Sequence, residues 1–209
     1  DSGTKVLIYS AEFAESAAEL RSRGDATQIQ HWIQVGGESA DGVVAYDDWI
    51  ASASDAEITV DAGDDDLLFI MYTSGTTGAP KGVLHAHRFL IGHLPSVECH
   101  HEGFPQPDDK GWTPADWAWI GGLMDMALPC LYHGVPLVAL RMAKFDAERA
   151  WSLIATEGIR NLFLPPTALK GLKDSLHASF AGTLAEHSIG FESIVSFATP
   201  RRLALLITG

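Results

Sequence analysis

The chain has 209 residues, 46% of them hydrophobic and 20% charged, a composition typical of a globular domain rather than of a disordered or fibrous chain. Its 14 basic and 27 acidic residues give a formal net charge of −13, which disfavours nucleic acid and anionic lipid as partners over the surface as a whole. No apolar run approaches the roughly 18 residues of a membrane span, and no charged-then-apolar leader is recognisable. Cys99 and Cys130 form no metal-ligand spacing and are expected to fill structural positions. We therefore expect a cytoplasmic protein.

The first third of the chain alternates between short apolar runs and helical patterns, which indicates β-α units. The acidic segment 61–66 is expected to be a hydrated linker, because consecutive side chains on a loop rarely converge on one metal ion. In chain order we predict a strand at 6–9, a helix capped by Ser10 with Phe13, Ala17 and Leu20 on one face, an extended segment at 29–35, and a helix at 46–53 with Trp49 and Ile50 turned inward.

Six apolar or aromatic residues at 67–72 are followed abruptly by Thr-Ser-Gly-Thr-Thr-Gly-Ala-Pro-Lys-Gly at 73–82. This pattern predicts a buried strand that leads into a tight loop. Glycines let backbone N–H groups approach a ligand, hydroxyls add hydrogen bonds, and proline stiffens the turn. Each charge-assisted hydrogen bond to a phosphate contributes roughly 1.5 to 3 kcal/mol. The sequence therefore predicts a phosphate-binding loop, with an ordinary Ser/Thr/Gly surface turn as the alternative.

Two familiar phosphate loops do not fit this stretch. The Walker loop ends in Gly-Lys-Ser/Thr, whereas Lys81 follows Pro80 and precedes Gly82. The dinucleotide fingerprint needs three spaced glycines at a strand-to-helix junction, and only Gly75 and Gly78 approximate that spacing. The stretch 72–82 instead resembles the signature loop of the adenylate-forming superfamily, which contains AMP-forming acyl-CoA synthetases, luciferases and peptide-synthetase adenylation domains.

After the loop we expect an extended segment at 83–84, preferably paired with the preceding strand in a hairpin-like turn. A helical pattern then begins at His87 and should be disturbed by Pro95, and 103–110 reads as a loop. Five histidines crowd the region 85–101, but their spacing is irregular and no Cys or Glu completes a zinc ligand set. We expect no metal site there.

The second informative stretch is 111–122, Gly-Trp-Thr-Pro-Ala-Asp-Trp-Ala-Trp-Ile-Gly-Gly. Indole rings of this kind can pack into a core or line an apolar pocket, and the residues alone leave both open. The stretch is similar to the segment of acetyl- and medium-chain acyl-CoA synthetases that borders the carboxylate pocket. That resemblance makes four residues candidates for the acyl end of the site: Asp116, Trp117, Trp119 and Gly122.

The remaining pattern is regular up to about residue 196. We predict an apolar helix at 123–132 ended by Gly134, a strand at 135–140, a helix begun by Asp146 and ended by Gly158, a strand at 159–164, a turn into a short helix at Pro165, Pro166 and Thr167, and a strand at 191–196. By the same resemblance Pro166 and Thr167 border the substrate, although a rigid turn is equally consistent with them. From Phe197 onward the resemblance ends.

Together these patterns predict an α/β fold in which parallel strands are covered by helices, as in an incomplete large domain of an adenylate-forming enzyme. We divide residues 1–209 of this partial AMP-binding domain into a leading segment at 1–66, a phosphate-loop and acyl-pocket segment at 67–173 and a divergent tail at 174–209. The family's adenine-stacking motif, its magnesium-binding glutamate and its C-terminal domain are not recognisable here.

The resemblance implies a ligase of fatty acid metabolism that activates a carboxylic acid of short or medium chain length with ATP and Mg²⁺ and then transfers it to coenzyme A. The alternatives are an adenylation domain that loads a carrier protein and an inactive nucleotide-binding remnant; we expect no turnover by this chain alone. The oligomeric state stays open. The resemblance assigns phosphate binding to Thr73, Ser74, Gly75, Thr76, Thr77, Gly78, Ala79, Pro80 and Lys81, with Lys81 and Thr76 as catalytic residues.

Overall fold

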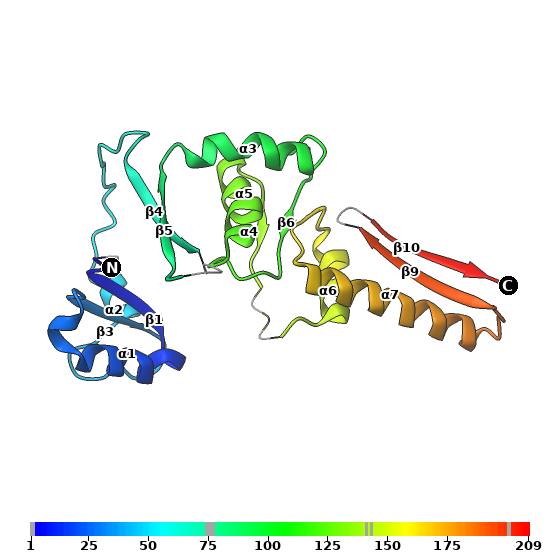
Figure 1. The fold of residues 1–209 in the computed structure, drawn as a ribbon, viewed down its shortest axis with the longest axis horizontal. Helices are drawn as coiled ribbons and strands as arrows, with labels where there is room; N and C mark the ends of the chain where they lie inside the picture. Colours follow the sequence, from blue (N-terminus) through cyan, green and yellow to red (C-terminus); the bar gives the residue numbers. More distant parts are fainter. Residues whose placement is uncertain (1–2, 74–77, 141, 143, 200–201) are drawn as a thin grey trace. The chain divides into compact units, whose positions relative to one another are not determined.

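The computed structural model divides the chain into two compact units, residues 1–85 and 86–209, which are considered one at a time. It describes residues 3–73, 78–140, 142, 144–199 and 202–209 (Figure 1). Both units combine parallel strands with helices, so the predicted α/β class is confirmed.

The first unit is built on a parallel sheet with the strand order β1-β2-β3. Ala17, Trp32 and Ile33 are buried and form its small core. The elements of this sheet and the segments between its strands are β1 (Val6–Ser10), η1 (Ala11–Phe13), α1 (Ala14–Ser22), η2 (Gly24–Ala26), β2 (His31–Val35), β3 (Val44–Ala45) and α2 (Tyr46–Ala51). The predicted β-α alternation of this region is therefore confirmed.

Three apolar residues on the predicted helices of the first unit are largely exposed. Phe13 is 56% exposed, and on α2 Trp49 and Ile50 are 42% and 51% exposed. Three short strands offer little apolar surface, and Trp49 packs edge-on against Tyr46 of its own helix, with ring centroids 6.3 Å apart. The inward orientation predicted for Trp49 and Ile50 is therefore wrong.

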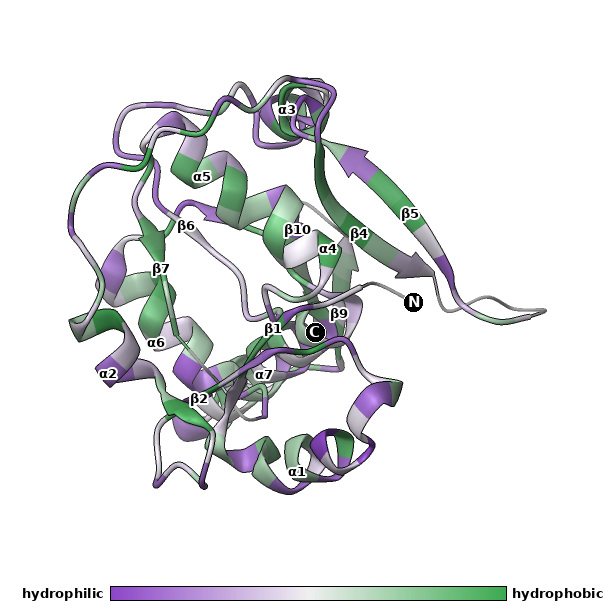
Figure 2. Cartoon of the chain, turned by 90° about the vertical axis from the view of Figure 1, so that its left-hand side faces the viewer, coloured by the Kyte–Doolittle hydropathy of each residue, from purple (hydrophilic) through white to green (hydrophobic). Residues whose placement is uncertain are grey.

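A separate two-stranded sheet in this part of the chain consists of β4 (Leu67–Thr73) and β5 (Lys81–Ala86). Figure 2 shows their arrows running in opposite directions, as a hairpin requires. The strands lie where the sequence predicts them, but Leu67 and Tyr72 are 53% and 50% exposed. A two-stranded ribbon cannot bury both of its faces, so the prediction that 67–72 is buried is wrong for this structure.

The second unit contains a three-stranded parallel sheet with the order β7-β6-β8. The fully buried Trp112 packs with Ala150, Ile159 and Leu172, and Phe104 packs with Met126 and Cys130 in a second cluster. The elements of this unit after β5 are α3 (Phe89–His100), β6 (Gly111–Trp112), α4 (Ile120–Gly122), the π-helical turn η3 (Leu123–Ala127), α5 (Leu128–His133), β7 (Leu137–Val138), α6 (Ala147–Glu157), β8 (Asn161–Leu162), α7 (Pro166–Glu186), β9 (Ser193–Thr199) and β10 (Arg202–Thr208). The last two strands form an antiparallel pair.

Two helix predictions for this unit are wrong. Helix α3 continues through Pro95. Because proline has no backbone N–H, the carbonyl of Ile91 loses its helical hydrogen bond. Ile91 lies on an exposed part of the helix, where water can bind that carbonyl instead. Helix α7 has 21 residues rather than a few, because Ala168 and Leu172 bury its first turns and the helix has no proline after Pro166.

Metal-binding groups, membrane-spanning helices and free cysteines are three further features on which the structure bears. In the described part of the chain, no three His, Cys, Asp or Glu side chains are grouped so that they could hold a metal ion, and no helix there is both long and apolar enough to cross a bilayer. Cys130 is buried, and desolvation raises the pKa of its thiol to about 11. Cys99 is exposed rather than a packed structural residue.

The boundaries of α6 provide a test of the local sequence signals. Asp146 Oδ1 accepts a 2.9 Å hydrogen bond from the backbone N–H of Arg149, and Gly158 ends the helix in the left-handed conformation. Asp146→Ala removes this cap and should destabilise the second unit by about 1 kcal/mol in urea unfolding followed by circular dichroism. The control Glu192→Ala, at an exposed acidic residue just before β9, should leave the midpoint near that of the original chain. Equal midpoints for both variants would contradict the capping role.

Candidate functional site

The described residues of the predicted phosphate loop lie at the surface. Thr73 is the last residue of β4 and Lys81 the first of β5, and both are exposed, as are Gly78, Ala79 and Pro80. Ser74, Gly75, Thr76 and Thr77 lie outside the described residues. Lys81 makes no ion pair with another residue that the structure describes, so its charge is available to an anion.

Gly82 explains how β4 and β5 keep this geometry. A Cβ atom at Gly82 would lie 3.0 Å from Ile70 Cγ2 and 3.5 Å from Tyr72 Cε1, on the paired strand. The missing side chain therefore lets the side chains of β4 cover the ribbon beside Lys81. Sequence reasoning counted Gly82 among the loop glycines, but the structure gives it a packing role.

The three tryptophans of the segment 111–122 have different environments. Trp112 is fully buried and belongs to the core, whereas Trp117 and Trp119 are 38% and 74% exposed. Asp116 shapes the turn between them: its Oδ1 accepts a 2.8 Å bond from Ala118 N–H, and its carbonyl accepts a 2.9 Å bond from Trp119 N–H. One oxygen of the Asp116 carboxylate therefore has a structural task here, and Asp116 is exposed, as are the indoles of Trp117 and Trp119.

Two buried glycines, Gly121 and Gly122, bring neighbouring segments into close contact. A Cβ at Gly122 would lie 2.9 Å from the carbonyl oxygen of Asp116, and one at Gly121 would collide with the ring of Phe163. Because Phe163 follows β8, the contact places the start of α4 against the strand exit that continues to Pro166. Two of the predicted substrate segments are therefore neighbours in the fold.

The strand exit after β8 forms the start of α7. Pro165 is the N-cap, Pro166 occupies the first turn, and both Pro166 and Thr167 are exposed. Proline is favoured at this position because the first helical N–H has no intrahelical partner. Both prolines therefore have a structural role at the start of the helix, and Pro166 also lines the cavity described next.

A cavity of about 860 Å³ lies within the second unit. Residues of α3, η3, α6, β8, α7, β9 and β10 line it. The lining combines apolar side chains such as Ile154, Leu164 and Leu169 with ionisable ones such as His100, Glu102 and Arg202. Of the predicted substrate residues, only Pro166 is part of its lining. The sequence contained no signal for this cavity, because its walls come from elements far apart along the chain.

Two histidine–carboxylate contacts join α3 to the helical segment 120–133. His93 Nε2 lies 2.8 Å from Asp125 Oδ1 in the π turn, and His133 Nε2 lies 3.1 Å from Glu98 Oε1. Phe89 stacks on His93, with ring centroids 5.8 Å apart. Irregular histidine spacing had concealed these contacts in the sequence, and of the four paired residues only Asp125 lines the cavity.

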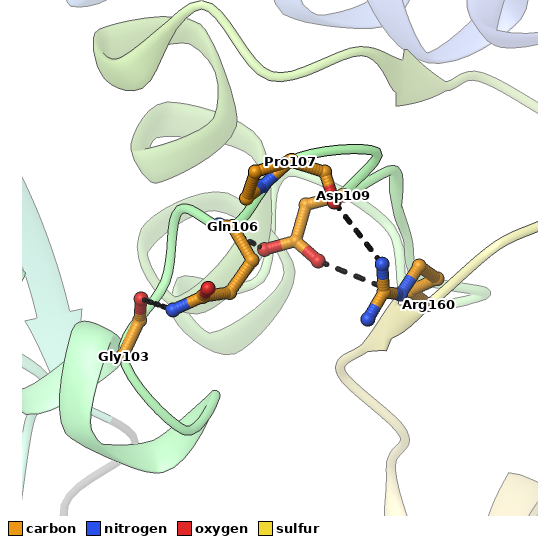
Figure 3. A network of polar contacts seen from close by, with 5 residues as sticks. All are labelled: Gly103, Gln106, Pro107, Asp109 and Arg160. Atoms are coloured by element: carbon orange, nitrogen blue, oxygen red, sulfur yellow. Dashed lines mark hydrogen bonds and ion pairs between the residues drawn. The ribbon is translucent and has the colours of Figure 1, made fainter.

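The cavity rim near β8 is fixed by the polar network in Figure 3. Arg160 Nη1 donates a 3.1 Å bond to the carbonyl of Pro107, and its Nε lies 3.9 Å from Asp109 Oδ1. The other carboxylate oxygen of Asp109 accepts a 2.7 Å bond from Gln106 N–H, and Gln106 Nε2 donates to the carbonyl of Gly103. The side chain of Asp109 is 4% exposed, so this network anchors the loop 103–110 to the residue that precedes β8.

Gly122→Ala tests the close contact in the candidate site. The added methyl group meets backbone at Asp116, so the turn 113–119 must shift, and we expect destabilisation of roughly 1 to 3 kcal/mol with altered tryptophan fluorescence. Gly92→Ala is the matched control, since Gly92 is also helical but has no atom within 4 Å of its Cβ position. That variant should be stabilised by up to about 1 kcal/mol. A gain in stability for Gly122→Ala would contradict the steric argument.

His101, in the cavity wall, provides a pH test. Burial lowers the pKa of His101 below 6.5 and His100 lowers it further, while Asp109 and Asp125 act in the opposite direction. Protonation is therefore more favourable in the unfolded chain, and this group contributes a loss of stability as the pH falls below 6.5. His101→Gln removes the loss, so the variant's Tm should rise relative to the original chain between about pH 7 and about pH 5. A Tm difference independent of pH would contradict the assignment.

The comparisons with known proteins agree with the loop and the fold. The family model described as AMP-binding enzyme matches residues 1–207. The chain is 34% identical over 164 residues to the long-chain-fatty-acid–CoA ligase FadD13 of Mycobacterium tuberculosis, covering 76% of this chain and 29% of that protein. It is 32% identical over 149 residues to acetyl-coenzyme A synthetase 1 of Pseudomonas aeruginosa, covering 66% of this chain and 22% of that protein.

Solved structures show the same relationship. The acyl-CoA synthetase of Brucella canis superimposes with a TM-score of 0.70 at 26% identity, and the match covers 83% of this chain and 30% of that one. The chain therefore spans less than a third of the length of each of these three proteins. The match of the family model over nearly the whole chain shows that the chain belongs to the AMP-binding enzyme family, whose members include acyl-CoA synthetases.

Proposed function

We propose that this chain is part of the large domain of an AMP-forming acid–thiol ligase. Its substrate is a carboxylic acid of short or medium chain length, which is first converted to an acyl-adenylate with release of pyrophosphate and then to an acyl-CoA with release of AMP. The proposal is supported above all by the family match over residues 1–207 together with the hydroxyl- and glycine-rich sequence 73–82, whose described residues 73 and 78–82 are exposed beside two paired strands.

The chemistry explains why such a loop is needed. A carboxylate is a poor acylating agent because oxide would be its leaving group, so the enzyme lets it attack the α-phosphorus of ATP. Phosphoryl chemistry depends mainly on positioning and on stabilisation of charge. We assign the hydroxyls of Thr73, Ser74, Thr76 and Thr77, the backbone N–H groups of Gly75 and Gly78, and the ammonium of Lys81 to the β and γ phosphates.

Magnesium and coenzyme A complete the proposed set of small molecules. Mg²⁺ prefers hard oxygen ligands and is commonly held partly by the nucleotide phosphates themselves. The described residues contain no group of three His, Cys, Asp or Glu side chains that could hold a metal ion. Coenzyme A enters as the thiol that displaces AMP, and we propose that the enzyme acts in fatty acid metabolism in the cytoplasm.

A second candidate follows from the coverage of the relatives. Because the chain spans only 22% to 30% of the three proteins named above, the isolated 209 residues are proposed to bind nucleotide without turnover. Titration calorimetry with ATP and Mg²⁺ tests the binding, and turnover by the isolated chain would contradict its inactivity. A carrier-protein-loading enzyme of the same family would differ in not requiring coenzyme A.

Carboxylate-dependent exchange of labelled pyrophosphate into ATP, measured on the full-length parent protein, tests the proposed reaction. Lys81→Ala should lower the exchange rate roughly 100-fold, because it removes a positive charge beside the developing pyrophosphate, and Thr76→Ala should lower it about 10-fold. Lys5→Ala, at another exposed lysine outside the loop, is the matched control and should not change it. Unchanged exchange in both loop variants would remove the loop from the mechanism.

A further inference from the structure

The strand β10 leaves one edge of its sheet unpaired. β9 and β10 form a two-stranded antiparallel sheet, in which every residue of β10 lies opposite a residue of β9. Helix α7 packs against β9, and in Figure 1 β10 lies on the side of β9 away from that helix. Among the residues that the structure describes, no strand pairs with the outer edge of β10. The backbone N–H and C=O groups along this edge are therefore open to another strand.

The sequence of β10 carries none of the features that keep exposed edges apart. Native proteins protect such edges with lysine, proline, an inward-facing charge or a β-bulge. The run 203–208, Leu-Ala-Leu-Leu-Ile-Thr, has no charged residue, proline or glycine, and its pairing with β9 is uninterrupted. Segments of this length with high β-propensity, low charge and no proline are typical of strands that associate with one another.

One face of this sheet is apolar and exposed. Val195 and Phe197 of β9 and Leu206 of β10 are 43%, 51% and 54% exposed. They share this face with Ala204, because Ala204 lies opposite Phe197 and Leu206 lies opposite Val195. Leu203, on the other face, packs against the core cluster of the second unit. The hairpin is therefore anchored by one face, whereas the outer edge and the other face stay accessible.

A second copy of β10 is the partner that fits this edge. Antiparallel pairing of two identical strands has two-fold symmetry and closes after two copies. When the pairing is centred on Leu205, the middle residue of the strand, every residue of β10 has a partner. The small Ala204 then lies opposite Leu206 of the other copy, and Arg202 lies opposite Thr208. Parallel pairing in register would instead place two arginines opposite each other, and like charges in that position are destabilising.

We propose that this chain forms a dimer by antiparallel pairing of two β10 strands, which joins the two hairpins into one four-stranded sheet. The residues paired across the two-fold axis are aliphatic on both faces of the sheet, and such cross-strand pairs stabilise a sheet. The proposal goes beyond the ligase reaction and does not rest on it, because β10 lies outside the predicted phosphate loop at 73–81.

Sedimentation velocity of the 209-residue chain tests the proposal at concentrations from about 1 to 100 µM, over which an interface of moderate affinity dissociates. The dimer fraction should rise with concentration. Leu206→Lys places a charge on the edge strand and should raise the dissociation constant roughly 10-fold or more. A chain that is monomeric at every concentration, or one that grows beyond dimers, would overturn the proposal.

Val195→Lys is the matched control for the edge. Val195 lies directly opposite Leu206 on the same face and is similarly exposed, so the two variants add the same charge to the same surface. Because Val195 is on β9, one strand away from the proposed contact, its replacement should leave the dissociation constant nearly unchanged. An equal loss of association in both variants would show that the apolar face, and not the edge, joins the copies.

Cysteine crosslinking tests the centre of the pairing without any lysine variant. In a Cys99→Ser background, which removes the exposed native thiol, Leu205→Cys places two thiols opposite each other on the two-fold axis, and mild oxidation should give a covalent dimer. Ser196→Cys is the control: Ser196 lies opposite Leu205 on β9 and is also half-buried. Its two copies would be three strand spacings, about 14 Å, apart, which is too far for a disulfide.

A covalent dimer of the Leu205→Cys variant alone supports the β10 pairing. Crosslinking of both cysteine variants, or of neither, would contradict it. Thermal unfolding followed by circular dichroism checks that all variants remain folded. Pyrophosphate exchange by the parent protein is measured separately, so the failure of either proposal leaves the other standing.

Discussion

The second unit depends on the complete burial of Trp112. Trp112 lies on β6, the middle strand of the sheet. Its indole packs with Ile159, with Ala150 of α6 and with Leu172 of α7. An aromatic side chain of this size contributes more apolar contact than any other residue of the cluster. This packing holds β6 in place. It therefore also positions the turn that follows β6, which carries the exposed indoles of Trp117 and Trp119, and the contact between Gly121 and Phe163.

The two units hold their candidate functional residues by different physical means. In the first unit, β4 and β5 pair on either side of the loop, and Gly82 leaves room for the side chains of Ile70 and Tyr72 on the paired strand. The cavity of the second unit is instead made by packing of helices and strands, and its lining combines apolar side chains with ionisable ones such as His101, Asp125 and Arg160.

Signals local in the sequence were read correctly. Asp146 and Gly158 bound α6, the strands on either side of the loop lie where predicted, and the family is apparent from 72–82. Features that depend on tertiary partners were not readable: the exposure of Trp49, the passage of α3 through Pro95 and the cavity all depend on what packs nearby. Periodicity marks an apolar face, but it does not say whether a surface exists to cover that face.

The π-helical turn at Leu123–Ala127 has a consequence for sequence change in this protein. Such a turn accommodates one residue more than an α-helical turn, and one residue corresponds to about 100° of rotation about the helix axis. A deletion of one residue within the turn would convert it to ordinary α-helix. The deletion would rotate either Asp125 or the following helix about the helix axis, so that one of them no longer faces α3. Natural length variation at this position would therefore separate members that keep an acidic cavity wall from members that lack one.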